Sequence, residues 1–204
     1  MNWQISVERH GAEEQPVVVI DGFADAARFR DDAAFLSFAP IGPHYPGIRA
    51  VVAPPMLRDP LARLAPIAAE VFGAGALEVV DAFYSIVTTP PSALTPIQRL
   101  PHVDGTDPSQ IAMMLYLHRP GPHSTHGGTA FFRHRTTGLE ALTAADYPRY
   151  AAALQADVAR TGLPPAAYTT DGAPHFERTH VAPATFNSAV FYRGNILHSG
   201  MIDN

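Results

Sequence analysis

The chain has 204 residues, a formal net charge of −5, 47% apolar residues and 16% charged residues. This length suits one domain with a sizeable core, and the mildly acidic balance argues against nucleic-acid binding. The absence of Cys excludes disulfides and thiolate metal sites, and the absence of Lys excludes Schiff-base chemistry. No apolar run is long enough for a transmembrane helix and no signal segment opens the chain, so we expect a cytoplasmic protein that does not enter a membrane.

The first part of the chain predicts two strands followed by two helices. Residues 3–9 alternate between polar and apolar side chains, and residues 16–21 are rich in β-branched residues, so both are typical of strands. Residues 25–38 and 57–72 carry apolar side chains at helical spacing. We expect these two helices to pack on a sheet.

The second part of the chain predicts mainly strands. Residues 77–89 form one long apolar strand pattern, and residues 139–163 have helical spacing with Tyr150, Leu154 and Val158 on one face. We therefore expect a helical insertion outside the sheet, between two strands. Short strands with turn signals between them indicate a β-sandwich or barrel rather than alternating βαβ units. The predicted short strands are 110–118, 129–133, 188–193 and 196–202.

Eight of the ten histidines lie after residue 100, and most of them have an ordinary explanation. His123 and His126 lie in a polar, Gly-rich loop, and His175 and His180 lie in a second polar stretch. Exposed loop positions account for these four residues. His134 stands between two arginines, where we expect an exposed strand end.

His102 differs because Asp104 follows it at the spacing of one strand face. On a strand, residues two apart point to the same side, so the imidazole and the carboxylate project together into the interior and Val103 points away. His198, on a later apolar strand, is the best candidate for a third ligand. Two His and one carboxylate form the facial triad of non-haem Fe(II) oxygenases. A hydrogen-bonded His–Asp pair without a metal is the alternative, and Asp107 is explained by turn chemistry.

The region from about 78 to 202 resembles an Fe(II)/2-oxoglutarate-dependent dioxygenase of the prolyl-hydroxylase-like branch. The blocks that match, in the same order, are VVDAFYSIV, PHVD, IAMMLYLHRPG with GGTAFF, and SAVFYRGNILHSG. The resemblance implies a mainly β fold with flanking helices, the double-stranded β-helix (jelly roll, cupin-like). We expect a single domain over 1–204, in which 1–76 buttresses a jelly-roll core at 77–204.

The same resemblance implies the roles of individual residues. His102, Asp104 and His198 would bind Fe(II) and form the catalytic centre. Tyr116 would hydrogen-bond the distal carboxylate of 2-oxoglutarate, and Tyr84 would line the cosubstrate site. The alternative for both tyrosines is that they are packing residues of the core.

The implied activity is hydroxylation of an unknown substrate with O2 and 2-oxoglutarate, releasing succinate and CO2, with ascorbate as an optional reductant. Small molecules, amino acids and peptides all remain open as substrates, and a homodimer is compatible with the sequence. Two alternatives use the same fold. One is a non-enzymatic cupin-like module that binds a metal or ligand, and the other is a metal-dependent hydrolase or isomerase.

The resemblance also implies a strand after the distal His that carries the cation for the 2-oxoglutarate carboxylate. Only six residues follow His198, so we expect a further C-terminal segment. If there is none, arginines or hydroxyl donors must replace that cation, because a buried anion without a partner is costly. Arg119, Arg133 and Arg193 are the candidates on or near the barrel strands.

Overall fold

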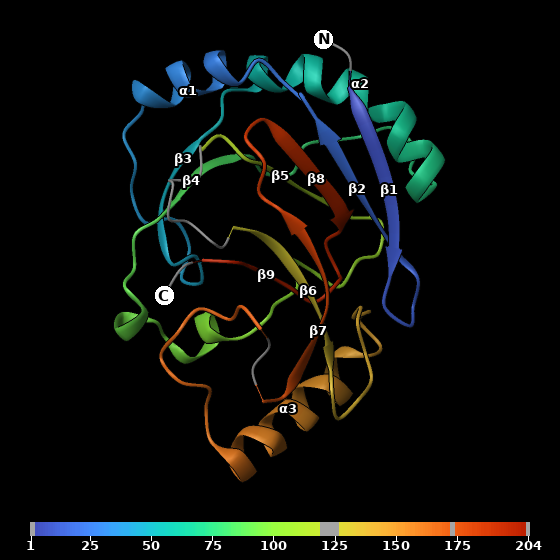
Figure 1. Cartoon of the computed structure of the whole chain (residues 1–204), viewed down its shortest axis with the longest axis vertical. Helices are drawn as coiled ribbons and strands as arrows, with labels where there is room; N and C mark the ends of the chain where they lie inside the picture. Colours follow the sequence, from blue (N-terminus) through green and yellow to red (C-terminus); the bar gives the residue numbers. More distant parts are fainter. Residues whose placement is uncertain (1–2, 119–126, 172–173, 203–204) are drawn as a thin grey trace.

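A computed structural model describes residues 3–118, 127–171 and 174–202 (Figure 1). The helices are α1 (Ala26–Ala34), α2 (Pro54–Phe72) and α3 (Tyr147–Thr161), with the short 3₁₀ turns η1 (Pro91–Ala93) and η2 (Pro96–Arg99). The strands are β1 (Gln4–His10), β2 (Gln15–Asp21), β3 (Gly47–Val51), β4 (Phe83–Val87), β5 (Ile111–Leu115), β6 (Gly128–His134), β7 (Phe176–Pro183), β8 (Ser188–Arg193) and β9 (His198–Gly200).

Two antiparallel sheets form the centre of the molecule. The large sheet has the order β1-β2-β8-β5, and the small sheet has the order β7-β6-β9. A separate two-stranded antiparallel sheet pairs β3 with β4, which α2 separates in the chain. The two sheets are joined by an apolar cluster that draws side chains from both of them. Its buried members are Val17, Tyr116, Phe131, Ala182, Val190, Tyr192 and Ile196.

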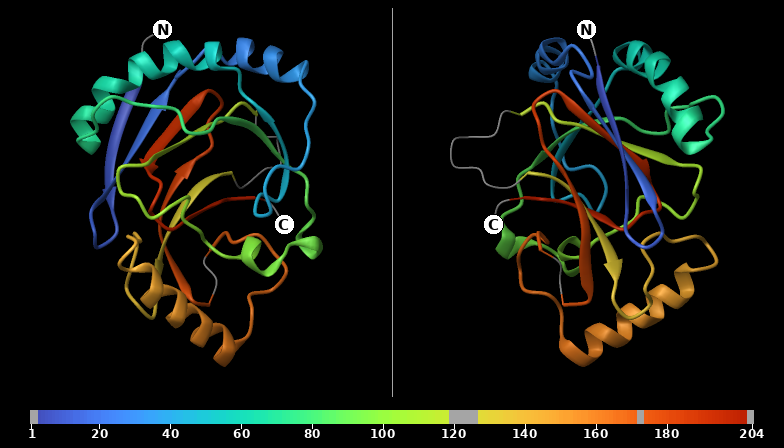
Figure 2. Two further views of the ribbon diagram at one scale, coloured as in Figure 1. Left: turned by 180° about the vertical axis from the view of Figure 1, so that it is seen from behind. Right: turned by 45° about the vertical axis from the view of Figure 1, so that its right-hand side comes forward.

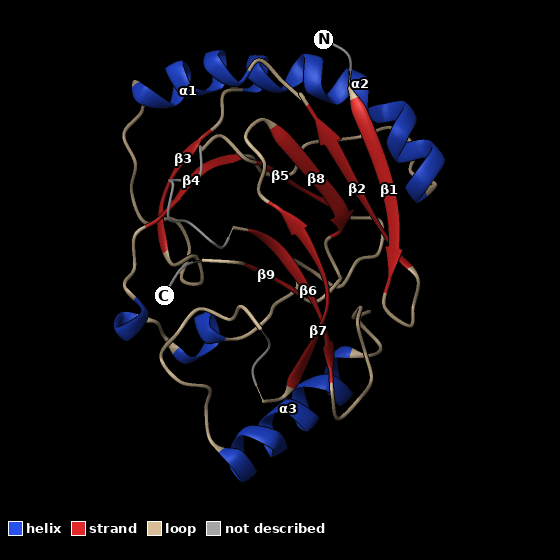
Figure 3. Cartoon of the chain, viewed as in Figure 1, coloured by secondary structure: helices blue, strands red, loops and turns tan. Residues whose placement is uncertain are grey.

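The helices cover the outer faces of these sheets (Figures 2 and 3). Phe29 of α1 and Leu64 of α2 pack with Val18 and Ile20 of β2, and Tyr150 of α3 packs with the small sheet. Strands β2 and β6 are therefore buried on both faces, which explains their nearly continuous apolar sequences. The mainly β architecture with flanking helices agrees with the sequence prediction, and so does the position of α3 between β6 and β7.

Several predicted boundaries were wrong for identifiable reasons. The long strand expected at 77–89 is reduced to Phe83–Val87, because its partner β3 offers only five residues for pairing. The helix expected at 25–38 ends at Ala34, since Ala39 bridges Arg49 in extended conformation. The helix expected at 139–163 begins only at Tyr147.

Glu140, just before α3, connects the β1–β2 hairpin to the small sheet. Its carboxylate accepts the amides of Ala12 and Glu13 at 2.9 and 3.1 Å and pairs with Arg133 of β6. Gly11 at the hairpin has φ +72°, and a Cβ there would collide with the Glu140 carboxylate. These contacts fix the tip of the large sheet against the small one.

Among the described helices, none is both long and apolar enough to cross a membrane.

Candidate metal centre

The backbone brings His102 and His198 side by side. His198 opens β9, and His102 lies in the extended segment that follows η2. The two residues exchange both backbone hydrogen bonds, at 2.9 Å from His102 N and 2.8 Å from His198 N. The amide of Asp104 donates to the carbonyl of Gly194 at 2.8 Å. Each of the three residues of the H-x-D…H pattern is thus positioned by the main chain.

The side chains of His102, Asp104 and His198 converge as the sequence predicted. One ligand atom from each lies within 4.8 Å of the other two. Asp104 Oδ1 is 3.8 Å from His102 Nε2 and 3.7 Å from His198 Nε2. Since metal–nitrogen and metal–oxygen bonds are about 2.0–2.2 Å long, atoms at this separation can bind one ion with little movement.

The expectation that His102 and Asp104 project into the interior was wrong. Their side chains are 54% and 37% exposed, whereas that of His198 is 7% exposed. The bridge between His102 and His198 is isolated, so this segment lies at the edge of the small sheet rather than within it. Solvent can therefore reach the side chains of His102 and Asp104, whereas His198 forms the buried side of the site.

The ring of His198 is fixed in the form that binds a metal. Its Nδ1 lies 2.8 Å from the carbonyl oxygen of Ile196. Because a carbonyl can only accept, Nδ1 carries the proton and Nε2 presents its lone pair to the site. This type of second hydrogen bond orients metal-binding histidines.

Protein groups also keep the ring of His102 neutral. Burial lowers its pKa to about 3, and the charges of His198, Arg49 and His44 lower it further. About half of the side chain is nonetheless open to solvent. The neutral imidazole is the form that coordinates a metal at neutral pH.

Three hydroxyl side chains lie between the two sheets, and one of them, Tyr192, packs against a ligand of the centre. The ring of Tyr192 lies 4.8 Å from that of His198, and burial followed by the Asp104 charge raises the pKa of Tyr192. The hydroxyls of Tyr116 and Thr129 are 2.8 Å apart, and burial raises the pKa of Tyr116 to about 12. These phenols remain protonated at neutral pH, so they can act as hydrogen-bond donors.

Tyr84 does not join this group. Its hydroxyl donates to Asp32 at 2.8 Å and its ring contacts Phe29, both on α1. The strand β4 alternates, so Tyr84 faces the helices while Phe83 faces the other way. The expected role of Tyr84 in lining a cosubstrate site receives no support from this position.

Two of the arginines considered for the distal carboxylate already have partners. Arg133 pairs with Glu140 and Glu177. Arg193 donates to the carbonyls of Pro108 and Phe72. Arg119 lies outside the described residues. Sequence reasoning missed Arg49, whose charge acts on His102, because no motif in GIRAV distinguishes it.

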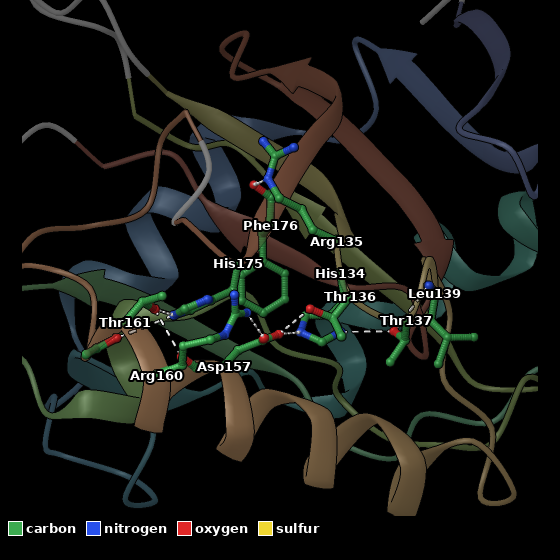
Figure 4. A network of polar contacts seen from close by, with 11 residues as sticks. His134, Arg135, Thr136, Thr137, Leu139, Asp157, Arg160, Thr161, His175 and Phe176 are labelled. Atoms are coloured by element: carbon green, nitrogen blue, oxygen red, sulfur yellow. Dashed lines mark hydrogen bonds and ion pairs between the residues drawn. The ribbon is translucent and has the colours of Figure 1, made fainter.

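The expectations for the remaining histidines were partly wrong. His134 and His175 are buried, not exposed, because α3 covers the end of the small sheet. His134 lies between Thr137, at 2.9 Å, and Asp157, at 3.3 Å, in the network of Figure 4. This network attaches α3 to β6. His180 is half-buried on β7, and the predicted exposure of His123 and His126 concerns residues outside the described ones.

Asp107 behaves as predicted. Its Oδ1 accepts the amide and the hydroxyl of Ser109, both at 2.8 Å, and caps the turn after Asp104. The two neighbouring carboxylates therefore have separate roles, one at the candidate centre and one in a turn.

The fold and the site together define a protein of two packed antiparallel sheets that carries a His-Asp-His cluster able to hold one metal ion. The whole chain, residues 1–204, matches the model of DUF6445, a family of unknown function, and the chain belongs to this family. Searches of curated proteins and of solved structures gave no match.

Proposed function

We propose that this protein is a non-haem Fe(II)- and 2-oxoglutarate-dependent oxygenase that hydroxylates its substrate and releases succinate and CO2. The observation that carries the proposal is the convergence of His102, Asp104 and His198 at one point. Two imidazoles and one carboxylate suit Fe(II) and leave open positions on the metal for other ligands. When bound, Fe(II) supplies the activation of O2, and 2-oxoglutarate supplies the electrons that its decarboxylation releases.

The strand order supports a jelly roll as the finer description of the fold. A jelly roll is a long antiparallel hairpin wound on itself, so that its strand pairs nest around the tip. Here β6 pairs with β7, β5 pairs with β8, and the segment at His102 pairs with β9. These pairs are nested in that order along the chain, and the third pair carries two of the proposed ligands.

The residues beside the centre fit a carboxylate cosubstrate in part. Tyr116 and Thr129 offer neutral hydroxyl donors between the two sheets, close to Tyr192. Tyr192 is itself buried and packs against His198. The chain's own contribution is thus a half-buried metal position with hydroxyl donors on its inner side. These residues orient a bound acid and exclude water from one side of the metal.

The experiment is an anaerobic titration of the Fe(II)-loaded protein with 2-oxoglutarate. We expect a visible charge-transfer absorption, followed in air by conversion of 2-oxoglutarate to succinate. Asp104→Asn should remove both signals, whereas Asp107→Asn, which changes a carboxylate of the same loop, should retain them. A protein that binds the metal but gives neither signal would be a cupin-like binding module or a metal-dependent hydrolase or isomerase instead.

A further inference from the structure

Arg49 of β3 lies between two aromatic rings on one face of the β3–β4 sheet. Its guanidinium carbon lies 3.9 Å from the centre of the Tyr45 ring and 5.2 Å from that of Phe83. Arg49 of β3 lies directly opposite Ser85 of β4, and Phe83 belongs to the same face of β4. The two rings restrict the guanidinium to a narrow range of positions.

This cation has no anionic partner within the described part of the chain. Its Nε is buried and makes no hydrogen bond. Arg133 and Arg178 differ, since Arg133 pairs with Glu140 and Arg178 pairs with Asp171. A buried donor without an acceptor is destabilising, so an acceptor from outside the chain that reaches the guanidinium would relieve this cost.

The β3–β4 sheet lies beside the candidate metal centre. Gln98 in η2, just before His102, donates to the carbonyl of His44 at 3.2 Å and so attaches the loop before β3 to the loop before the H-x-D segment. The charges of Arg49 and His44 also act on the ring of His102. A bound divalent metal and Arg49 together would outweigh the single Asp104 carboxylate, which makes this side of the centre attractive to anions.

Arg49 approaches the centre from a different side than the tyrosines. Tyr192 contacts His198 and lies near Asp104 and Tyr116, in the layer between the sheets. Arg49 belongs to the β3–β4 sheet, and its charge lowers the pKa of His102, the most exposed ligand. Hydroxyl donors on the inner side and a cation on the outer side provide separate positions for two molecules.

We propose that Arg49 binds a carboxylate or phosphate group of the primary substrate, so that the substrates of this centre are anionic molecules. That the bound anion is a substrate rests on the proposed function. Binding of an anion at Arg49 can be tested without turnover. A planar guanidinium matches both carboxylate and phosphate through paired hydrogen bonds. Its two aromatic neighbours add the rigidity that makes such a position selective.

The test uses the Zn(II)-loaded protein with saturating 2-oxoglutarate, to which acetate or methyl phosphate is added separately. NMR follows the Nε–H signal of Arg49. We expect a saturable shift of this signal and a loss of probe affinity of at least tenfold in Arg49→Met, with 2-oxoglutarate affinity changed less than twofold. Arg63→Met is the control, because Arg63 of α2 also lies over an aromatic ring, 5.4 Å from the centre of the Trp3 ring.

Two outcomes would overturn the inference. Probe binding that is the same in Arg49→Met and wild type would show that Arg49 does not bind anions. A tenfold loss of 2-oxoglutarate affinity in Arg49→Met would assign the residue to the cosubstrate. If Arg49→Met does not fold, Arg49→Lys keeps the charge but not the paired donors, and we expect it to bind the probes several-fold more weakly. Absence of the charge-transfer absorption in the separate Fe(II) titration would contradict the proposed function alone.

Discussion

His102 and His198 are joined by two backbone hydrogen bonds of 2.9 and 2.8 Å, and their rings lie 4.4 Å apart. The sheet pairing therefore sets the distance between the two imidazoles. Side-chain packing is needed only to orient the rings. Because the backbone positions the two residues, we expect substitutions of the ligand side chains to abolish metal binding without disrupting the backbone pairing of His102 with His198.

Replacing His102 with alanine should remove most of the metal affinity. The side chain is 54% exposed, so its loss should change the free energy of unfolding by less than about 0.5 kcal/mol. We expect Co(II) affinity, measured by absorption titration, to fall by about 100-fold or more, beyond the loss typical of outer-shell changes. His180→Gln alters a histidine on β7 and should leave Co(II) affinity intact. Equal affinity in His102→Ala and wild type would contradict the site.

The Tyr116–Thr129 pair allows a double-mutant test. Tyr116→Phe or Thr129→Val alone leaves one buried hydroxyl unpaired, so each should lower the free energy of unfolding by about 1–3 kcal/mol. The double variant removes both partners and should lose less than the sum. Tyr116→Phe should also weaken 2-oxoglutarate binding if its hydroxyl contacts the cosubstrate. Urea unfolding and calorimetric titration separate the two effects, and additive losses would argue against a coupled pair.

His10 should make the protein less stable in acid. Burial lowers its pKa to about 4, aided by His180 and opposed by Glu140, and neither ring nitrogen has a hydrogen-bond partner. The unfolded chain binds the proton near pH 6.5, so stability is full above that pH and is lost as the pH falls towards 4. At about pH 5 the resulting loss in the free energy of unfolding is roughly 2 kcal/mol.

His10→Phe tests this linkage directly. Phenylalanine keeps the contacts with the rings of Phe131 and His180 and removes the titrating group. We expect the difference in unfolding free energy between about pH 7.5 and pH 5 to be smaller in the variant than in wild type, both measured without metal. An unchanged pH dependence would mean that His10 is not responsible.

Asp157 should control the attachment of α3. Its carboxylate lies within the network of His134, Thr136 and Arg160 shown in Figure 4. Asp157→Ala leaves the buried Nε2 of His134 without its carboxylate partner, so we expect the free energy of unfolding to fall by at least about 2 kcal/mol. Hydrogen exchange should increase first in residues 147–161 rather than in β2 or β8. A uniform increase over the whole chain would indicate that the network does not act locally.

The sequence predicts local structure best where one pattern has one explanation. PVVVID and SAVFYR form β2 and β8 as expected, because uninterrupted β-branched and aromatic runs suit strands buried on both faces. The H-x-D pair and His198 converge as predicted. Their exposure was not predictable, because the alternation of a strand does not tell whether the strand lies at a sheet edge.

Long-range packing accounts for the remaining differences. His134 is flanked by arginines and resembles a surface residue, yet α3 covers it completely. Tyr84 and Phe83 are adjacent aromatics, and only the pairing with β3 decides which of them faces the helices. Arg49 is near His102 because two loops distant in the sequence are attached to each other at Gln98 and His44.

The nesting of the strand pairs has a consequence for how the protein matures. During synthesis, β6 and β7 can pair early, whereas the ligand set is incomplete until His198 has been made. A nascent chain that has not reached His198 therefore offers only the His102–Asp104 half of the cluster, so an ion could bind the full cluster only after β9 has been made. Ions that bind the native cluster but not the unfolded chain would then stabilise the pairing of the His102 segment with β9 by mass action.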